Sequence, residues 1–427
     1  MKSNGKRIAT AWAAMVLAAP LIAHAADCAA LTELALPDVR ITSAEDHTAG
    51  PFTPPGSRSG RAMELPAFCR VQAVATPTAE SEIHFEVWLP DGADWNGRML
   101  GTGNGGYTGA IQYGALANGL RQGFVTASND TGHTGSDLSF GFVHREKIED
   151  WAHRAAHVSG EAAKLVARAR YGRLPHHAYF SGCSTGGHQA LSQAQRYPGG
   201  YDGILAGAPA HNRTRLNAGF LWSWLALHDE SGAPLLSADE LALVSRTMVE
   251  RCDARDGVVD GVVDDPRQCG FDPEVLRCQG DDSGECLTGV QVEALQKVYA
   301  GPRNPRTGEA IFTGWPAGSE APPAGGGWAT YLVAPPQPMR LDYWGRWVFG
   351  DPNWDYRTFD WDHDLAYAEE RLKIVDSTDA ELREFRWSGG KLLMYAGWAD
   401  AVVPPGDTVE YFDALRRAAG NADAVGE

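Results

Sequence analysis

The sequence is poor in basic residues and, beyond Ile22, contains no apolar run long enough to cross a bilayer. Lys and Arg number 37 against 54 Asp and Glu, which gives a net charge of −17. Such an excess of acid argues against nucleic acid or an anionic membrane as the binding partner. Low-complexity segments and internal repeats are also missing. The plentiful Gly (49), Pro (25) and Trp (14) instead indicate a loop-rich globular protein.

Residues 1–25 have the layout of a secretory signal peptide. Three basic residues precede an apolar run over Ile8–Ile22, and the small residues of Ala23–Ala25 follow as a cleavage site. A membrane anchor is the alternative, but the run is shorter than the roughly 20 residues of a span and is broken by Pro20. We predict a mature chain that begins near Ala26 and resides in the periplasm or outside the cell. It keeps 34 of the 37 basic residues against all 54 acidic ones, a charge of −20.

The seven cysteines are an odd number for an exported chain, in which every pair that geometry allows should oxidise. Six can pair, and the sequence favours disulfides that tie down the N-terminus and close an Asp- and Gly-rich segment: Cys28–Cys69, Cys252–Cys269 and Cys278–Cys286. Cys183 is left over. It is interpreted either as a small buried apolar residue under a turn or as half of a disulfide whose partner is absent from this chain.

Alternating strand and helix patterns predict an α/β fold with a mostly parallel sheet covered on both faces. Short apolar or alternating segments bounded by Gly, Pro, Asn or Asp indicate strands, and longer amphipathic stretches indicate helices. The predicted strands are 83–89, 99–103, 124–128, 176–182, 204–207 and 391–397, and the predicted helices are 149–169, 186–197 and 407–419.

A mature chain of about 400 residues exceeds what one hydrophobic core normally holds, so a second domain or a large insertion is expected. The regular rhythm fails at 211–375, which holds four cysteines, Pro- and Gly-rich stretches and many Trp and Tyr. We predict a lid domain there, inserted between a first core part at 26–210 and a second at 376–427. No strand pattern follows the last helix, so the core is expected to be incomplete at its C-terminal end.

The segment Gly182-Cys183-Ser184-Thr185-Gly186 fits the G-x-S-x-G pattern of a nucleophile elbow, with the required strand before it and helix after it. A serine on this strained turn points its hydroxyl outward, and the glycines let strand and helix approach closely. The pattern indicates an α/β-hydrolase fold with Ser184 as nucleophile. The Thr185 amide, at the helix N-terminus, is the predicted first donor of the oxyanion hole. The alternative is a plain Gly-rich turn.

A second oxyanion donor is expected from the loop after an earlier strand. The available segment is Gly103-Asn104-Gly105-Gly106-Tyr107, because glycines let backbone amides face a ligand. Gly106 is the predicted donor, with Gly105 as its neighbour. A tight structural turn is the alternative.

The acid and base of this fold follow the serine in the order Asp, His, each at the carboxyl end of a strand. Asp400 fits the acid because an apolar strand and a Gly-containing turn precede it, whereas the alternative, Asp407, resembles the cap of the next helix. No histidine follows Asp400, since the last one is His363. We expect the base to lie beyond Glu427.

Four earlier histidines are the other candidates for the base. His188 follows Ser184 by one helical turn, and its side chain should not reach back over the serine hydroxyl. The others are predicted on loops, where they are interpreted as hydrogen-bonded or substrate-side residues: His133, His211 and His228. A chain that lacks both a base and a partner for Cys183 is most simply interpreted as a fragment.

Together these motifs resemble the tannase and feruloyl esterase family, which includes the mono(hydroxyethyl) terephthalate hydrolases. The resemblance covers essentially the whole mature chain and rests on the spacing of six cysteines and on three segments: Gly182–Gly187, the Asp- and Gly-rich loop after Cys252, and Tyr395–Asp400. It implies a Cys-Ser, Asp, His-Cys arrangement, in which a disulfide joins the residue before the nucleophile to the residue after the histidine. The partner of Cys183 would then lie beyond Glu427, and the 427-residue chain alone is expected to show no more than trace activity.

The resemblance also implies one calcium ion in the lid domain. The implied ligands are three side chains and two backbone carbonyls of the loop Asp253–Val262: Asp253, Asp256 and Asp260, with Val258 and Val262. Closely spaced carboxylates, with glycines that permit sharp bends, can surround a hard cation with oxygens. The ligand spacing and the lack of a terminal Glu exclude an EF-hand. A solvated acidic turn is the alternative.

The predicted function is a serine esterase that hydrolyses aromatic carboxylic esters, feruloyl (hydroxycinnamoyl) esters above all, through an acyl-enzyme. Galloyl esters and terephthalate monoesters are the alternatives within the resembled family. Aromatic residues of the lid are candidates for contact with a planar acid, although each is more readily explained as a core residue: Trp344, Trp347, Trp354 and Tyr356. A secreted calcium-binding protein without catalysis is the alternative of another class.

Overall fold

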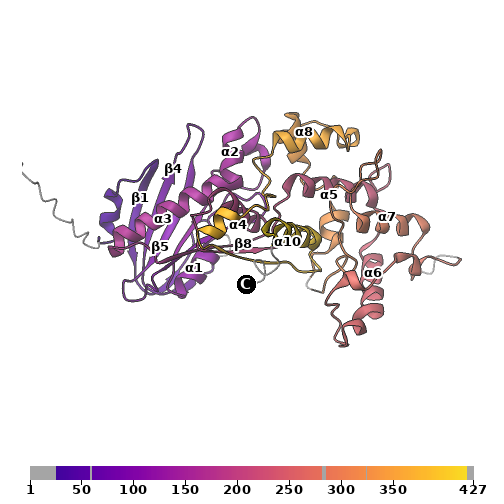
Figure 1. Cartoon of the computed structure of the whole chain (residues 1–427), viewed down its shortest axis with the longest axis horizontal. Coiled ribbons are helices and arrows are strands. Elements are labelled where there is room, and N and C mark those ends of the chain that lie inside the picture. Colours follow the sequence, from indigo (N-terminus) through magenta and orange to yellow (C-terminus); the bar gives the residue numbers. More distant parts are fainter. Residues whose placement is uncertain (1–25, 58–59, 281–284, 324, 421–427) are drawn as a thin grey trace, which may run out of the picture.

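The computed structural model describes residues 26–57, 60–280, 285–323 and 325–420 (Figure 1). The predicted signal peptide, residues 1–25, lies outside the described residues. The strands are β1 (Val39–His47), β2 (Gly50–Phe52), β3 (Met63–Leu65), β4 (Phe68–Ala75), β5 (Ile83–Pro90), β6 (Arg98–Thr102), β7 (Val125–Asn129), β8 (His177–Cys183), β9 (Gly203–Gly207) and β10 (Lys391–Tyr395). The α-helices are α1 (Tyr113–Arg121), α2 (Arg145–Glu149), α3 (Ala155–Tyr171), α4 (Thr185–Arg196), α5 (Arg213–Leu227), α6 (Ala238–Cys252), α7 (Gly289–Ala300), α8 (His363–Arg371), α9 (Arg383–Trp387) and α10 (Pro405–Ala419).

Eight strands form one sheet in the order β1-β4-β5-β7-β6-β8-β9-β10. The pairs from β1 to β7 along this order are antiparallel, and those from β7 to β10 are parallel. Parallel neighbours need long crossover connections, and helices supply them here. The predicted α/β sheet is therefore confirmed. The carboxyl ends of β6, β8, β9 and β10 meet at one edge of it.

Alternation along β5 shows how the sheet is covered. Phe85, Val87 and Leu89 point to one face, where they pack with α3 and α4, and Trp88 points to the other, where it packs with α1. Tyr411 brings α10 onto the first face. Helices thus lie on both faces, and α3 runs across the sheet in Figure 1.

The sequence does not predict β1 or β4, and β4 shows why. Arg70 and Gln72 interrupt its apolar pattern, yet both are half-buried because they donate hydrogen bonds to the carboxylate of Glu86 on β5. Glu86, 3% exposed, also accepts a hydrogen bond from the Trp88 indole. A satisfied polar network thus occupies positions where a sequence pattern expects apolar side chains.

The helix predicted at 149–169 starts earlier and is not uniform. It runs from Arg145 through a π-helical turn at Asp150–Arg154 and continues to Tyr171. Buried Asp150 accepts hydrogen bonds from Arg154 and Ser81 at this wide turn. Gly172 follows with φ of 73°, a conformation that favours glycine and ends the helix.

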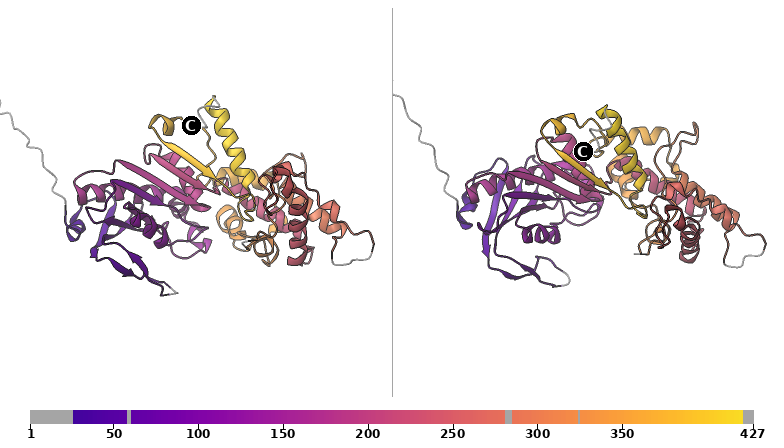
Figure 2. Two further views of the ribbon diagram at one scale, coloured as in Figure 1. Left: turned by 90° about the horizontal axis from the view of Figure 1, so that it is seen from below. Right: turned by 60° about the horizontal axis from the view of Figure 1, so that its bottom comes forward.

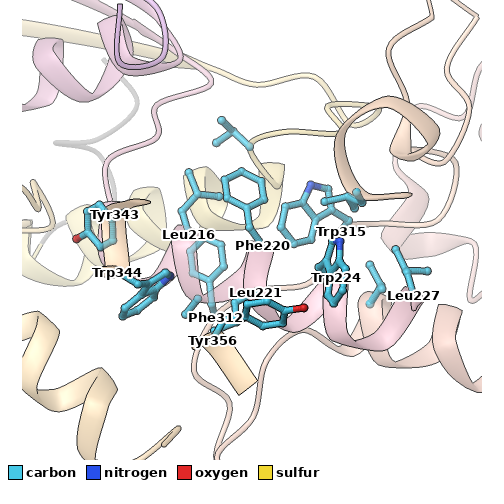
Figure 3. Close-up of a cluster of buried hydrophobic side chains, with 14 of the residues drawn as sticks. Leu216, Phe220, Leu221, Trp224, Leu227, Phe312, Trp315, Tyr343, Trp344 and Tyr356 are labelled. Atoms are coloured by element: carbon cyan, nitrogen blue, oxygen red, sulfur yellow. The ribbon is translucent and has the colours of Figure 1, made fainter. Parts of the chain in front are cut away.

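Residues 211–375, predicted to lack regular rhythm, contain α5, α6, α7 and α8 and form a helical half beside the sheet (Figures 1 and 2). Its aromatic and aliphatic side chains build a second core, centred on α5 (Figure 3). Trp344, Trp347 and Tyr356 are buried in that core, and Trp354 packs against it. The interpretation of these aromatics as core residues therefore holds, and the three buried ones do not present a surface to a substrate.

Candidate active site

Ser184 sits between the last residue of β8 and the first residue of α4. Its φ of 60° and ψ of −119° are strained for a residue with a side chain. The Ser184 amide donates to the Gly207 carbonyl at 3.0 Å, and the Ser184 carbonyl accepts from the amides of His188 at 3.0 Å and Ala210 at 3.2 Å. The turn is therefore held on both sides by the backbone of β9 and α4.

The glycines around this turn are required by close contacts. A Cβ on Gly182 would lie 2.4 Å from the Gly186 carbonyl carbon, and one on Gly187 would lie 2.4 Å from the Gly207 carbonyl oxygen. A Cβ on Gly103 would likewise lie 2.4 Å from the Gly186 Cα. The strand, the helix and the loop after β6 thus touch backbone to backbone at the elbow.

The loop after β6 lies against the N-terminus of α4. Asn104 anchors it, because its side-chain amide donates to the carbonyls of Ala110 at 3.0 Å and Asn129 at 2.9 Å. The Gly105 and Gly106 amides donate to no other residue in the described part of the chain, and Gly106 has φ of 56°. This loop thus has unpaired backbone amides and lies in contact with the elbow, and the second oxyanion donor stays a prediction.

Tyr107 ties the same loop to the helical half. Its ring stacks on Trp151 at 4.6 Å and meets Trp347 edge-on at 5.5 Å. Its carbonyl accepts a hydrogen bond of 2.8 Å from His133 Nε2. The position of the loop is therefore set by a fully buried aromatic cluster.

Asp400 follows β10, at the same sheet edge as Ser184. In register across three parallel strands, Cys183 pairs with Gly207 and Gly207 pairs with Tyr395. The half-buried Asp400 carboxylate uses Oδ1 to accept the amides of Val402 at 2.8 Å and Val403 at 2.9 Å. One carboxylate oxygen is thus fixed by the loop backbone, which leaves the other for a catalytic partner.

Asp407, the alternative acid, does not cap α10. The helix begins at Pro405 after Pro404, and the Asp407 side chain is buried 3.3 Å from His211 Nδ1. Burial raises the pKa of Asp407 well above its usual range. A buried carboxyl inside the first helical turn suits a structural role, and Asp400 stays the better candidate.

Cys183 is exposed and forms no disulfide among the described cysteines. The Tyr395 ring covers Gly207 on the neighbouring strand, since a Cβ on Gly207 would lie 2.3 Å from Tyr395 Cζ. Burial and the adjacent Cys183 thiol raise the pKa of Tyr395. The interpretation of Cys183 as a buried apolar residue is therefore wrong. The predicted disulfides are all present, at Cys28–Cys69, Cys252–Cys269 and Cys278–Cys286.

The four candidate histidines are buried and hydrogen-bonded to backbone carbonyls. His188 Nε2 contacts the Val375 carbonyl at 2.6 Å, and His228 contacts the carbonyls of Trp224 and Val333. Burial lowers the pKa of His133, and it lowers the pKa of His211 to about 4. His133, His211 and His228 lie outside helices and strands, as predicted, and their contacts agree with the interpretation as hydrogen-bonded residues.

Sequence reasoning missed Arg213, whose guanidinium reaches the hydroxyl of Thr185. The segment Asn212-Arg213-Thr214-Arg215 is polar and charged, a composition typical of a solvated helix start. Its burial depends on the aromatic rings of Tyr107 and Trp151, which lie far away in the sequence. No local pattern could have indicated it.

The predicted calcium loop follows α6 and is closed by the Cys252–Cys269 disulfide. The Asp253 carboxylate, 8% exposed, accepts the amides of Asp260 at 3.2 Å and Gly261 at 3.1 Å, and Asp256 accepts the amide of Val258 at 2.9 Å. The loop thus folds back on its own carboxylates.

The carboxylate and carbonyl oxygens of this loop suit a hard cation. In this arrangement, however, the carboxylates accept hydrogen bonds from backbone amides. Among the described residues, one trio of candidate ligand side chains lies within 4.8 Å of one another, and it contains the disulfide-bonded Cys28 and Cys69 with Asp46. A calcium ion would therefore have to draw the loop carboxylates closer together. Val258 and Val262, whose carbonyls are implied ligands, are exposed.

A serine on a strained strand-to-helix turn, at the carboxyl edge of a mostly parallel sheet, defines an α/β-hydrolase. The family model described as tannase and feruloyl esterase matches residues 69–426, so the chain belongs to this family. It is a carboxylic ester hydrolase that acts on a small-molecule ester.

Relatives and a solved structure agree with this assignment. An uncharacterized esterase of Xanthomonas campestris pv. campestris is 39% identical over 97% of this chain and 74% of its own length. A probable feruloyl esterase B-2 of Aspergillus flavus is 32% identical over 82% of this chain and 66% of its own length. The crystal structure of feruloyl esterase B from Aspergillus oryzae matches with a TM-score of 0.84 at 29% identity, covering 91% of this chain and 78% of that one.

None of the helices in the described part of the chain has the length and apolar character that a bilayer-spanning segment needs.

Proposed function

We propose that this esterase hydrolyses esters of aromatic carboxylic acids, feruloyl (hydroxycinnamoyl) esters above all, with Ser184 as its nucleophile. The observation that carries the proposal is the strained strand-to-helix turn at Ser184, which is in backbone contact with the loop that holds the free amides of Gly105 and Gly106. The similarity to proteins named as feruloyl esterases supports the choice of acyl group.

In the proposed reaction, the Ser184 oxygen attacks the ester carbonyl and forms a tetrahedral intermediate. The developing oxyanion accepts hydrogen bonds from the Thr185 amide and from an amide of the Gly105–Gly106 pair. Collapse expels the alcohol and leaves an acyl group on Ser184, which water then removes. A general base must take the serine proton and return it to the leaving alcohol, and Asp400 is the proposed acid that orients such a base.

None of the four buried histidines is the proposed general base. Each has a backbone carbonyl within hydrogen-bonding distance of a ring nitrogen, as His188 and His211 show. In the arrangement implied by the family resemblance, the base is a histidine next to the cysteine that pairs with Cys183.

We further propose a calcium site in the Asp253–Val262 loop, a lid role for residues 211–375, and export from the cytoplasm. Three carboxylates in a loop closed by a disulfide support the calcium site. The position of the helical half beside the carboxyl edge of the sheet supports the lid (Figure 2). Three disulfides support an oxidising compartment, and the charge pattern of residues 1–25 supports a signal peptide.

The test compares hydrolysis of methyl ferulate, methyl gallate and mono(2-hydroxyethyl) terephthalate by the protein expressed from its natural gene and by its Ser184→Ala variant. We expect the highest kcat/KM for methyl ferulate and loss of turnover by several orders of magnitude in the variant. Retention of most turnover without Ser184 would exclude it as the nucleophile. A preference for another ester would overturn the choice of acyl group alone.

A further inference from the structure

Arg213, the first residue of α5, is a buried cation beside the nucleophile elbow. It is 5% exposed, and its guanidinium Nη2 donates a hydrogen bond of 3.0 Å to the Thr185 hydroxyl. Two aromatic rings enclose it, since Cζ lies 5.4 Å from the ring centroid of Tyr107 and 5.3 Å from that of Trp151. Its Nε is buried without a hydrogen-bond partner among the described residues.

The half-buried Arg70 and Arg154 have carboxylate partners, whereas the more deeply buried Arg213 forms no ion pair with a described carboxylate. Arg70 pairs with Glu86, and Arg154 pairs with three acidic residues of its own helix region. Asp376 attracts the Arg213 charge from a distance, without forming an ion pair, and Arg340 repels it. The positive charge is therefore desolvated and only partly balanced.

The location of Arg213 is also unfavourable for helix stability. A cation in the first turn of α5 opposes the partial positive charge of the helix N-terminus. Burial lowers the pKa of Arg213, but arginine stays protonated because its ordinary pKa is so high. Burial, with the Arg213 charge as the next cause, also holds the pKa of His188 well below its usual range. A buried cation that weakens the fold indicates a functional demand at this position.

We infer that Arg213 is a positioning residue of the oxyanion hole. Its hydrogen bond fixes Thr185, whose amide is the proposed oxyanion donor, and its charge supplies a fixed positive potential at Ser184. As the bond from Ser184 Oγ to the ester carbon forms, the carbonyl electron pair moves onto oxygen, and this negative charge develops beside a cation that cannot reorient. Arg213 transfers no proton and does not touch the substrate. The catalytic part of this inference rests on the proposed function.

The effect of the Arg213 charge on the potential at position 184 is tested without measuring catalysis. In the 427-residue chain, the double variant Cys183→Ser with Ser184→Cys leaves one titratable thiol, at the elbow, because the other six cysteines form disulfides. The pH dependence of its alkylation by iodoacetamide gives the pKa of that thiol. Three further substitutions are compared in this background: Arg213→Met, which has similar length and no charge, Arg213→Lys, which keeps the charge, and Arg215→Met as a matched control. Arg215 belongs to the same helix but pairs with Glu369 at the surface.

We expect Arg213→Met to raise the thiol pKa by about one unit, which lowers the thiolate fraction roughly tenfold at neutral pH. Arg213→Lys should keep most of the effect, and Arg215→Met should change nothing. A shift with Arg213→Met no larger than that with Arg215→Met overturns the inference.

The catalytic part is tested with Ser184 in place. Arg213→Met should lower kcat for methyl ferulate about tenfold or more with KM within about twofold, and its melting temperature should equal or exceed that of the parent. A fall in melting temperature with kcat unchanged would mean a purely structural arginine and overturn the inference. If Ser184→Ala kept its turnover, the proposed function would fail, and the thiol measurement would still decide whether Arg213 sets the potential at position 184.

Discussion

The guanidinium carbon of Arg267 lies 4.6 Å from the ring centroid of Trp398. Arg267 belongs to the segment closed by the Cys252–Cys269 disulfide and is held by two hydrogen bonds to Asp265. Trp398 stands in the turn that leads to Asp400. The segment proposed to bind calcium thus rests on the loop of the proposed catalytic acid.

This contact predicts that Arg267→Gln lowers turnover more than its small effect on stability would suggest. Loss of a partly exposed cation–π contact should cost about 0.5–1 kcal/mol of unfolding free energy. Because the Asp400 loop loses a support, we expect kcat to fall severalfold. Arg277→Gln, which removes an exposed ion pair with Glu274 in the same half, is the control. Equal kcat values for the two variants would contradict the prediction.

The strained backbone of Ser184 predicts opposite effects on activity and stability. Ser184→Gly should abolish ester hydrolysis, yet raise the free energy of unfolding by roughly 1 kcal/mol, because glycine adopts φ of 60° without steric cost. Ser184→Ala should be equally inactive but gain less stability. Urea unfolding of the three proteins checks the order. A Gly variant less stable than the Ala variant would show that the turn is not strained.

The backbone contacts at the elbow predict different outcomes for two glycines. Gly187→Ala should destabilise the fold by roughly 2–4 kcal/mol, because its Cβ would lie 2.4 Å from the Gly207 carbonyl oxygen, where only backbone can give way. Gly105→Ala, whose Cβ meets nothing within 4 Å, should change stability by less than about 0.5 kcal/mol. Thermal unfolding of both variants tests this, and similar losses would contradict it.

The proposed calcium site predicts a melting temperature that depends on free calcium. At about 100 times the dissociation constant, the ion should add roughly 2.7 kcal/mol of stability, and excess chelator should remove it. Asp253→Asn should abolish this dependence, whereas Asp272→Asn, which changes an exposed helix cap shortly after the disulfide-closed segment, should preserve it. An unchanged melting curve in chelator, with no calcium found by mass spectrometry of the native protein, would contradict the site.

The buried Asp130 carboxyl predicts that the protein loses stability as the pH rises. Burial raises its pKa to about 6, above the value of about 3.9 for an unfolded chain. The folded state therefore holds this proton more tightly. The contribution of Asp130 to stability is fully present below about pH 4 and is lost as the pH rises through 6.

Asp130→Asn keeps an oxygen acceptor for the amides of His84 and Gly132 and removes the charge. It should stabilise the protein at pH 7 by roughly 1–3 kcal/mol and have little effect near pH 3.5. The pKa of Asp137 is lowered chiefly by a hydrogen bond from Ser139. Asp137→Asn should therefore destabilise the protein at pH 7. Urea unfolding at both pH values tests the pair. A loss of stability with Asp130→Asn at pH 7 would contradict the assignment.

The half of the sheet that carries the site could be predicted from the sequence because its signals are local. The G-x-S-x-G segment lies between an apolar strand and an amphipathic helix, and the structure places β8 and α4 within a residue or so of the predicted bounds. β10 before Asp400 also begins where predicted, at Lys391, but ends at Tyr395, two residues before the predicted end. Each of these elements is recognised from adjacent residues alone.

Strand β4, the burial of Arg213 and the helices of residues 211–375 could not be predicted because they depend on residues far away in the sequence. Arg70 and Gln72 on β4 are half-buried through a carboxylate on β5, and Arg213 is buried by rings from two other segments. Helix α5 packs against both α7 and α8, so it is buried on nearly all sides and shows little helical periodicity. In α5, for example, polar Thr214 and Asn217 are as buried as the apolar residues beside them.

The buried cluster of Tyr107, Trp151 and Trp347 has a consequence for how substrate reaches Ser184. The first two rings belong to the sheet half and the third to the helical half, and they share one continuous core. A hinge motion that swung the helical half away as a rigid body would have to break this core. The helical half proposed as a lid is therefore expected to stay in place, and access to Ser184 is expected through smaller movements of the surrounding loops.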